Sequence, residues 1–413
     1  MNEKIIRNLA EERGTPLFIY DANSIDRKCS LLKSLKALGV EILYSIKANP
    51  NAEVCQFIRN QELLAEIASR GELAIARESG FDLSSCMVAG PAKKIKDIVA
   101  MIEGGIGFIN CESVNEAKRI NDIARAGGRR IKINIRINPR DIGAGSRIKM
   151  GGRSSPFGID EEEMDEALEQ LDQLDMIELS GIHVYSGTQF LDPLVIRRNF
   201  EYVFQLSQHF RVILGRAPSV INFGGGFGIP FSGEEQPIDE ALLMEELYSF
   251  FSKIRADESF WETRFFIESG RFITGDCGYF VCSIVDIKVS RGKKFVIVDG
   301  GINNYMSLSP HFRFDGKNPG VYLVRHSMAR SLVAGGDAGN EGGDAEGYDP
   351  ESVEVVDIAG PLCTSLDCLA RKVSLSSPQI GDLVVFPNAG AYSLSMSPTG
   401  FLSHDLPGEV LIW

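Results

Sequence analysis

The chain has 413 residues, of which 44% are hydrophobic and 24% charged, and its net charge is −13. This length and composition are typical of a folded protein with roughly two domains. The negative charge argues against nucleic acid and against an anionic membrane as partners, because both bind basic surfaces. No stretch of about 18 apolar residues occurs, and the first ten residues lack the apolar core of a signal peptide. We therefore expect a cytoplasmic protein that acts on a small molecule.

The eight cysteines are scattered along the chain without a Cys-x-x-Cys pair, and the five histidines have no metal-ligand spacing. We therefore expect no metal site. Apart from Cys363, we interpret the cysteines as reduced and mostly buried thiols.

Short β-rich runs alternate with longer amphipathic stretches between residues 40 and 270. The strand candidates are residues 42–48, 63–68, 85–89, 106–110, 131–138, 178–185, 219–223 and 264–268. Helix candidates lie between them, for example residues 51–60, 113–126 and 160–174, and Ser113 with Glu116 forms a capping-box pattern. Repeated strand–helix alternation predicts a parallel sheet. Eight strands close a (β/α)8 barrel, which we assign to residues 23–270.

The pattern changes after residue 270, where strand-like runs follow one another without long helices between them. These runs are residues 279–289, 294–299, 352–358, 383–386 and 409–412. They predict a second, mainly antiparallel β domain built from residues 271–413 and joined by residues 1–22, so that the whole chain has an α/β fold. Residues 334–348 are rich in Gly, Asp, Asn and Glu, and we expect them to form a mobile surface insertion.

Several chemically unusual residues fall at the ends of predicted barrel strands, where a (β/α)8 barrel has its active site. Lys47 ends an apolar run, and burial lowers the pKa of a lysine so that its neutral amine can form an imine with a carbonyl group. A lysine that merely extends into solvent is the alternative. His183 also ends a strand, either as a site residue or as a core histidine.

Three consecutive glycines, Gly224, Gly225 and Gly226, follow another predicted strand. Their backbone N–H groups could approach a phosphate, although a sharp turn would also use glycines, and the spacing does not match the dinucleotide-binding pattern. Glu268 and Arg271 end the last strand. They could bind a protonated ring nitrogen and a phosphate, or could form a structural salt bridge.

Together these segments resemble the fold type III decarboxylases that depend on pyridoxal phosphate (PLP), the ornithine and diaminopimelate decarboxylase family. The resemblance implies that Lys47 is catalytic and carries PLP as a Schiff base, and that His183 stacks on the cofactor ring. It implies that Ser186 meets the phosphate and that Glu268, in Glu268-Ser-Gly-Arg271, pairs with the ring nitrogen. Further cofactor-binding residues implied by it are Gly224, Gly225, Gly226, Gly270, Arg271 and Tyr392.

The resemblance is weaker on the substrate side. Cys363 matches a catalytic cysteine that reaches across a dimer interface, which implies a homodimer with shared active sites. Thr364 replaces the acidic residue that follows this cysteine in ornithine- and diaminopimelate-type enzymes, and residues 304–308 replace an Arg-Pro-x-Leu-Tyr segment that binds a second carboxylate. We assign substrate contacts to Asp367, Thr364 and Arg136.

Residues 147–152, 183–189 and 360–364 resemble a branch of the family that includes the butirosin glutamyl-carrier-protein decarboxylase and siderophore citryl–diamino-acid decarboxylases. We therefore expect decarboxylation of an amino acid whose distal end is acylated, in a specialised biosynthetic pathway. The alternatives are a decarboxylase of free diaminopimelate or another basic amino acid, an amino-acid racemase, and a PLP-binding protein without activity.

A carrier protein would be acidic and would need a basic surface on this acidic chain. Two clusters are candidates for that surface, and each could equally be an ordinary solvated face. They are Arg136, Arg140, Arg147, Lys149 and Arg153, and Lys93, Lys94 and Lys96.

Overall fold

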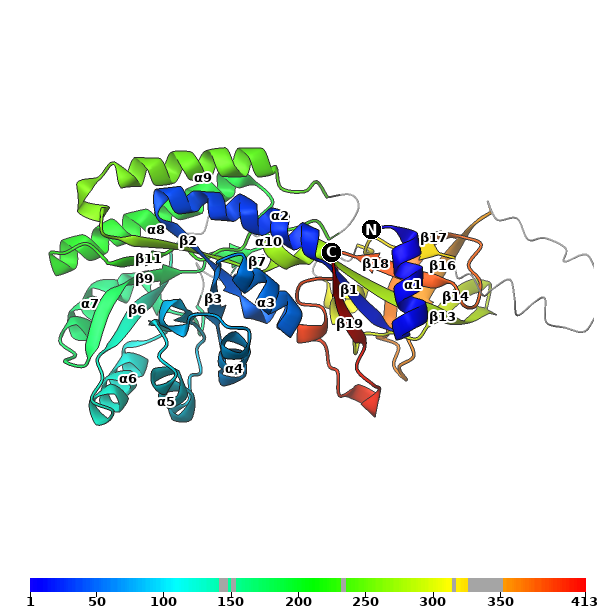
Figure 1. The fold of residues 1–413 in the computed structure, drawn as a ribbon, viewed down its shortest axis with the longest axis horizontal. Coiled ribbons are helices and arrows are strands. Elements are labelled where there is room, and N and C mark those ends of the chain that lie inside the picture. The colour runs from blue at the N-terminus through cyan, green and yellow to red at the C-terminus, as the bar shows by residue number, and fades with distance from the viewer. Residues whose placement is uncertain (141–147, 150–153, 232–234, 314–316, 326–351) are drawn as a thin grey trace, which may run out of the picture. The chain divides into compact units, whose positions relative to one another are not determined.

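The structure is a computed structural model that describes residues 1–140, 148–149, 154–231, 235–313, 317–325 and 352–413. Two compact units make up the chain (Figure 1). The barrel unit contains Asn23–Ile229 and Gln236–Thr274, and the β unit contains Met1–Ala22, Pro230–Glu235 and Gly275–Trp413. The predicted insertion at 334–348 lies outside the described residues, as do Arg147 and Arg153.

Eight parallel strands form the closed sheet of the barrel unit, in the order β5-β4-β3-β2-β12-β11-β9-β6, with a β5–β6 pairing that completes the circle. Their bounds are β2 Val40–Ser45, β3 Leu64–Ile67, β4 Met87–Val88, β5 Phe108–Cys111, β6 Ile131–Asn138, β9 Ile177–Val184, β11 Val220–Asn222 and β12 Arg264–Ser269. A short strand, β8 (Ile159–Asp160), lies beside β6. Each predicted barrel strand is present, and the predicted (β/α)8 fold is confirmed.

Helices follow most of these strands and surround the barrel (Figure 1). They are α2 Ala22–Lys33, α3 Ala52–Asn60, α4 Arg70–Glu78, α5 Ile95–Glu103, α6 Val114–Ala126, α7 Met164–Asp172, α8 Pro193–Leu214, α9 Glu240–Arg255 and the short α10 Arg271–Thr274. Helix α6 begins with the predicted capping box. The hydroxyl of Ser113, the N-cap, accepts the N–H of Glu116, and the Glu116 carboxylate reaches back to accept the N–H of Glu112, one residue before the N-cap.

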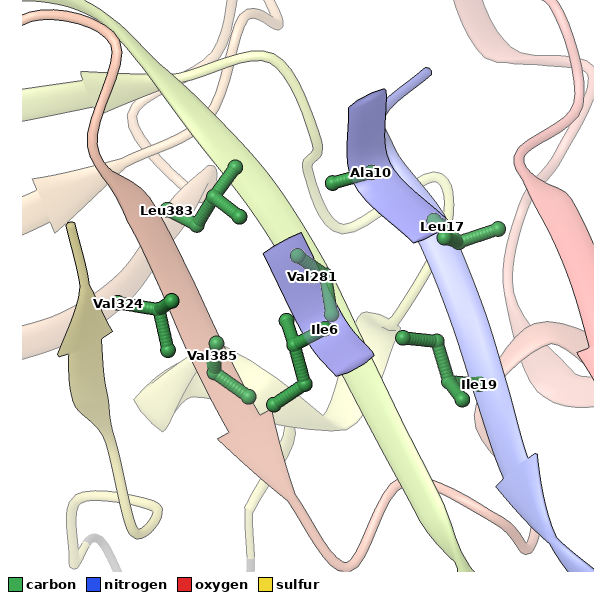
Figure 2. Close-up of a cluster of buried hydrophobic side chains, with 8 residues drawn as sticks. All are labelled: Ile6, Ala10, Leu17, Ile19, Val281, Val324, Leu383 and Val385. Atoms are coloured by element: carbon green, nitrogen blue, oxygen red, sulfur yellow. The ribbon is translucent and has the colours of Figure 1, made fainter. Parts of the chain in front are cut away.

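A mostly antiparallel sheet forms the β unit, with parallel pairing only at β1–β19 and β14–β16 among the described strands. Its elements are α1 Glu3–Arg13, β1 Leu17–Asp21, β13 Gly278–Ser290, β14 Lys293–Val298, β15 Tyr322–Val324, β16 Val353–Ala359, β17 Cys368–Ser376, β18 Leu383–Pro387 and β19 Gly408–Ile412. Helix α1 buries Ile6 and Ala10 in an apolar cluster with side chains of β1, β13, β15 and β18 (Figure 2). The chain's first residues therefore complete the core of a sheet formed mostly by its last 140 or so.

Side chains inside the barrel form two layers. Residues in register on neighbouring strands point to the same side of a sheet, and the next residue on that side lies two positions further along. The lower layer is apolar and contains Leu43, Met87, Phe108, Val220 and Phe266. Two positions further along three of these strands, towards their carboxyl ends, lie the buried polar residues Asn110, Asn222 and Glu268, and buried Glu66 lies two positions after Leu64, which packs against the apolar cluster. The barrel interior is therefore closed by hydrocarbon at its base and polar at the end where barrel enzymes have their active sites.

No helix in the described part of the chain is long and apolar enough to cross a membrane.

Candidate active site

Lys47 lies directly after strand β2, in the 3-10 turn Ile46–Ala48, so the strand ends at Ser45 and not at residue 48 as predicted. The turn directs the side chain towards the neighbouring strand β3, where Nζ lies 2.8 Å and 2.6 Å from the two carboxylate oxygens of Glu66. Glu66 is fully buried, whereas 38% of the Lys47 side chain is exposed. The amine is thus held in one place by a buried anion and is still accessible from outside.

A second carboxylate, Glu72, lies near this pair at the start of α4. Its side chain accepts the N–H of Ala68 at 2.6 Å. Burial and the charge of Glu66 raise the pKa of Glu72 to about 7, although Lys47 and the Ala68 N–H act in the opposite direction.

The raised pKa of Glu72 predicts a pH dependence that Glu72→Gln removes. The folded protein holds this proton more tightly than the unfolded chain does, so ionisation between about pH 4.5 and pH 7 costs stability. From pH 5 to pH 8 the wild type should lose about 2 kcal/mol of unfolding free energy relative to the variant. Urea denaturation of both proteins at the two pH values measures the difference, and parallel pH profiles would contradict it.

His183, Asn222 and Glu268 meet inside the barrel at the ends of the adjacent strands β9, β11 and β12. Glu268 Oε1 lies 3.1 Å from His183 Nε2 and accepts a hydrogen bond from Asn222 Nδ2 at 2.9 Å. Burial alone would raise the pKa of Glu268, but His183, Lys47 and Asn222 together lower it to about 2. Glu268 is therefore a buried permanent anion, and it can pair with a protonated ring nitrogen.

The three glycines form a loop that only glycine fits. Gly224 and Gly226 have φ values of 66° and 90°, in the region that disfavours other residues. A Cβ atom on Gly225 would clash with the carbonyl oxygen of Glu268, and one on Gly226 would clash with that of Gly187. Among the described residues, the N–H groups of Gly225 and Gly226 have no acceptor. These donors and the close approach of the backbone suit a phosphate.

Gly225→Ala tests the fit of this loop. Because the added methyl would meet backbone at the end of β12, we expect about 1–3 kcal/mol of destabilisation and loss of PLP affinity of tenfold or more. Gly71→Ala is the matched control, since a Cβ there meets only the Ser69 hydroxyl at 3.6 Å. Melting curves and PLP titrations of both variants measure the effects, and equal PLP affinity in the two would remove this loop from the cofactor site.

The remaining predicted residues of the barrel unit follow the same strand ends. Ser186 comes two residues after β9 and is half-buried, and Arg271 begins helix α10 directly after Gly270. A Cβ on Gly270 would lie 2.8 Å from the Cβ of Ala48, so this glycine lets the end of β12 pack on the Lys47 turn. The predicted cofactor residues of this unit therefore lie at or just after the carboxyl ends of β2, β12, β11 and β9, which are four consecutive neighbours in the barrel.

Two residues of this region were not predicted from the sequence. Asn222 donates to Glu268, and its side-chain oxygen accepts the N–H of Gly224 at 2.9 Å, so one side chain orients both the anion and the glycine loop. Its signal was an amide inside an otherwise apolar strand. Tyr185, directly after β9, lies close enough to Lys47, Glu268 and Arg271 to interact electrostatically with them, and burial raises the pKa of its phenol.

The predicted basic surfaces are wrong for several of their members. Lys93 is buried and lies 3.1 Å from the buried Glu116, and Arg136 is buried and lies 2.9 Å from Glu112. Glu112 also accepts the N–H groups of Gly90 and Gly158. Lys93 lies in the loop between β4 and α5 and Arg136 lies within β6, and each is neutralised inside the protein by the buried acid that it faces.

The other three clustered cations whose side chains the structure describes are Arg140, Lys94 and Lys96, and all of them lie on the surface. Arg140 is paired at 2.7 Å with Glu162, whereas Lys94 is exposed, and so is Lys96.

Cys363, Thr364, Asp367 and Tyr392 belong to the β unit. Cys363 is exposed in the turn between β16 and β17, and Tyr392 has a positive φ of 58° in the turn after β18. Asp367 is buried, and its two carboxylate oxygens accept the N–H groups of Ile302 and Leu362, each at 2.8 Å. All eight cysteines are free thiols, and six of them are buried.

Comparisons with known proteins agree with this geometry. Residues 22–275 match the family model of the pyridoxal-binding domain of pyridoxal-dependent decarboxylases. The L-glutamyl-[BtrI acyl-carrier protein] decarboxylase of Niallia circulans is 33% identical over all of this chain and 92% of its own length. The diaminopimelate decarboxylase of Methanothermobacter thermautotrophicus is 30% identical over 98% of this chain and 88% of its own length.

Solved structures share the fold. The crystal structure of diaminopimelate decarboxylase from M. jannaschii in complex with L-lysine has a TM-score of 0.83 at 24% identity, covering 98% of this chain and 89% of that one. The buried Glu268 anion, the accessible Lys47 amine and the glycine loop are the groups that the ring nitrogen, carbonyl carbon and phosphate of PLP require. The chain belongs to the pyridoxal-dependent decarboxylase family, whose members are amino-acid decarboxylases that use pyridoxal phosphate.

Proposed function

We propose that this enzyme decarboxylates an amino acid whose distal end is acylated, either as a small conjugate or on a carrier protein, in a specialised biosynthetic pathway. The observation that carries the proposal is the lack of a free charge in two segments, residues 360–367 around Cys363 and residues 304–308. Asp367 is the only charged residue of segment 360–367, and backbone N–H groups occupy both of its oxygens. Residues 304–308 are also uncharged. A free distal ammonium or carboxylate would find no counter-ion there.

The similarity to a decarboxylase of a carrier-bound glutamyl group supports the same substrate class. That relative acts on a carrier-protein substrate by its name, and it matches this chain from end to end. A free basic amino acid, the substrate class of the diaminopimelate decarboxylases, is the competing possibility.

The proposed roles of the residues follow from their positions. When bound, PLP supplies an electron-withdrawing ring that accepts the electron pair left on Cα as carbon dioxide departs. Lys47 binds the cofactor's carbonyl carbon, and Glu66 holds Lys47 Nζ in position. Glu268 holds a proton on the ring nitrogen, and His183 packs against the ring. Ser186, Arg271 and the glycine loop bind the phosphate, and for Tyr392 of the β unit the cofactor role rests on the family resemblance alone.

We further propose that the active enzyme is a homodimer in which Cys363 of one chain completes the site of the other and returns a proton to Cα. The exposure of the Cys363 thiol in the single chain supports this role. The eight free thiols fit a reducing compartment, which favours the cytoplasm.

Release of carbon dioxide by the PLP-loaded protein tests the substrate class. The panel should contain free ornithine, lysine and diaminopimelate, their N-acylated and citryl conjugates, and aminoacyl carrier proteins. Release only from acylated substrates is expected. Faster release from a free diamino acid would refute the acylated-substrate proposal and leave the cofactor assignment intact.

Cys363→Ala should retain bound PLP and lower kcat by about 10²–10⁴-fold, the usual contribution of a positioned proton donor. Cys368→Ala is the matched control, because that half-buried thiol lies on strand β17 and its Sγ lies 3.6 Å from the Ala370 carbonyl oxygen. Steady-state kinetics and analysis of the product's Cα protonation measure the effect. Full activity in the Cys363 variant would exclude the thiol from the reaction.

A further inference from the structure

Asp367 joins two separate segments of the β unit through one buried carboxylate. Oδ1 accepts the N–H of Ile302, and Oδ2 accepts the N–H of Leu362, both at 2.8 Å. Leu362 directly precedes Cys363, and Ile302 lies two residues before the uncharged segment 304–308. The Asp367 side chain that joins the two segments is 4% exposed, and the Ser309 hydroxyl adds a second link by donating to the carbonyl of Leu366 at 2.8 Å.

Two glycines make the space for this carboxylate. A Cβ on Gly301 would lie 2.8 Å from Asp367 Oδ1, and a Cβ on Gly360 would clash with Oδ2 and lie 2.7 Å from the Cα of Gly301. Neither glycine has a positive φ, so crowding and not backbone conformation excludes a larger residue there. The carboxylate therefore has both a backbone N–H donor for each oxygen and a space that only glycine at positions 301 and 360 leaves open.

Backbone hydrogen bonds close the segment that carries Cys363 around the same carboxylate. Gly360 donates to the Asp367 carbonyl at 3.0 Å, Thr364 donates to that of Leu362 at 2.8 Å, and Asp367 donates to that of Thr364 at 3.2 Å. On the other segment, Asn304 and Tyr305 donate to the carbonyl of Gly301 at 2.9 Å and 3.0 Å. Both turns are thus internally ordered, and the Asp367 side chain bonds the backbone of both.

The Asp367 carboxylate is placed to influence Cys363, because it accepts the N–H of Leu362, the residue directly before that exposed thiol. Its burial raises the pKa of Asp367, while the two N–H donors oppose that effect. Removing one acceptor would leave a buried N–H without a partner, which typically costs more than the hydrogen bond itself contributes. The local result would be movement of one turn relative to the other.

We infer that Asp367 is a positioning residue that fixes Cys363 relative to residues 304–308, and does not contact the substrate. The inference rests on the proposed function only in taking Cys363 as the proton donor. This role explains why segment 360–367 contains Asp367 and yet has no free charge for the distal end of the substrate.

The test compares Asp367→Asn with Asp382→Asn in the full-length protein. The amide at 367 can accept one N–H but turns a donor towards the other. Asp382 is a matched control, because it is buried in the same unit and accepts the N–H of Gln379 at 3.0 Å and a bond from Arg325 at 2.5 Å, away from Cys363. The readout is the alkylation rate of Cys363 by iodoacetamide, assigned by tandem mass spectrometry, together with kcat and KM.

We expect Asp367→Asn to change the alkylation rate at least threefold and to lower kcat about tenfold with KM changed less than twofold, whereas Asp382→Asn leaves both unchanged. An alkylation rate equal to wild type in a folded Asp367→Asn protein would overturn the inference, and so would equal changes in the two variants. A large rise in KM with normal kcat would show instead that Asp367 binds substrate.

If Asp367→Asn does not fold, Gly301→Ala replaces it. This variant keeps the carboxylate but crowds it, and the same change in alkylation is expected, with an unchanged rate again overturning the inference. Because alkylation needs neither substrate nor cofactor, its result is independent of which amino acids release carbon dioxide.

Discussion

Lys47→Ala is expected to abolish decarboxylation and to remove the visible absorbance that the wild-type protein acquires with PLP. The amine is the one nucleophile that we assign to the cofactor's carbonyl carbon, and its neighbour Glu66 holds it there through both carboxylate oxygens. Loss of a covalent anchor cannot be replaced by the noncovalent contacts of the phosphate and ring. Carbon dioxide release and absorbance spectra of the purified variant, before and after dialysis, measure the two effects.

Lys94→Ala is the control for this experiment, because Lys94 is exposed and lies outside the strand ends that carry the site. It should retain wild-type absorbance and turnover. If the Lys47 variant kept the dialysis-resistant visible band, another amine would have to carry the cofactor, and the assignment of the site to the end of β2 would be wrong.

Glu268→Gln is expected to lower kcat by about 100-fold or more while PLP still binds. The wild-type carboxylate is a buried anion, because His183, Lys47 and Asn222 outweigh its burial and lower its pKa to about 2. A glutamine has nearly the same shape but no charge, so it cannot hold a proton on the ring nitrogen. Preorganised charges of this kind typically contribute effects of about this size.

The measurement for Glu268→Gln is kcat across pH 5–9, with bound PLP quantified in each sample. Glu41→Gln, at the opposite end of neighbouring strand β2 and paired with Arg264 at 2.8 Å, controls for the loss of a charge near the barrel. A Glu268→Gln enzyme within threefold of wild type would exclude the ring-nitrogen role.

The barrel could be predicted from the sequence because its eight strands are rich in apolar residues and alternate with helices. Strand β17 and helix α1 were missed for different reasons. Strand β17 exposes Arg371 and Lys372 in its middle, where its register with β16 is irregular, so its alternation is interrupted. Helix α1 is largely polar and buries only Ile6 and Ala10, so few of its residues mark a side that faces a core.

The residues of the candidate site could also be predicted only in part. Residues whose type is chemically unusual at a strand end, such as Lys47 and Glu268, could be identified from the sequence. Residues whose role depends on a partner far away in the chain could not. The buried pairing of Lys93 with Glu116 requires two separate strand–helix loops to meet, and a lysine run alone does not reveal that meeting.

The order of strands around the barrel has a consequence for how the enzyme's specificity can change. The groups that we assign to the cofactor follow one continuous arc of strands, from β2 through β12 and β11 to β9, while the ends of β4, β5 and β6 carry a separate set of buried ion pairs. Most substitutions on the second arc would therefore change strands other than those that carry the cofactor residues. Arg136 is the exception, because it lies in register with His183 where β6 and β9 adjoin.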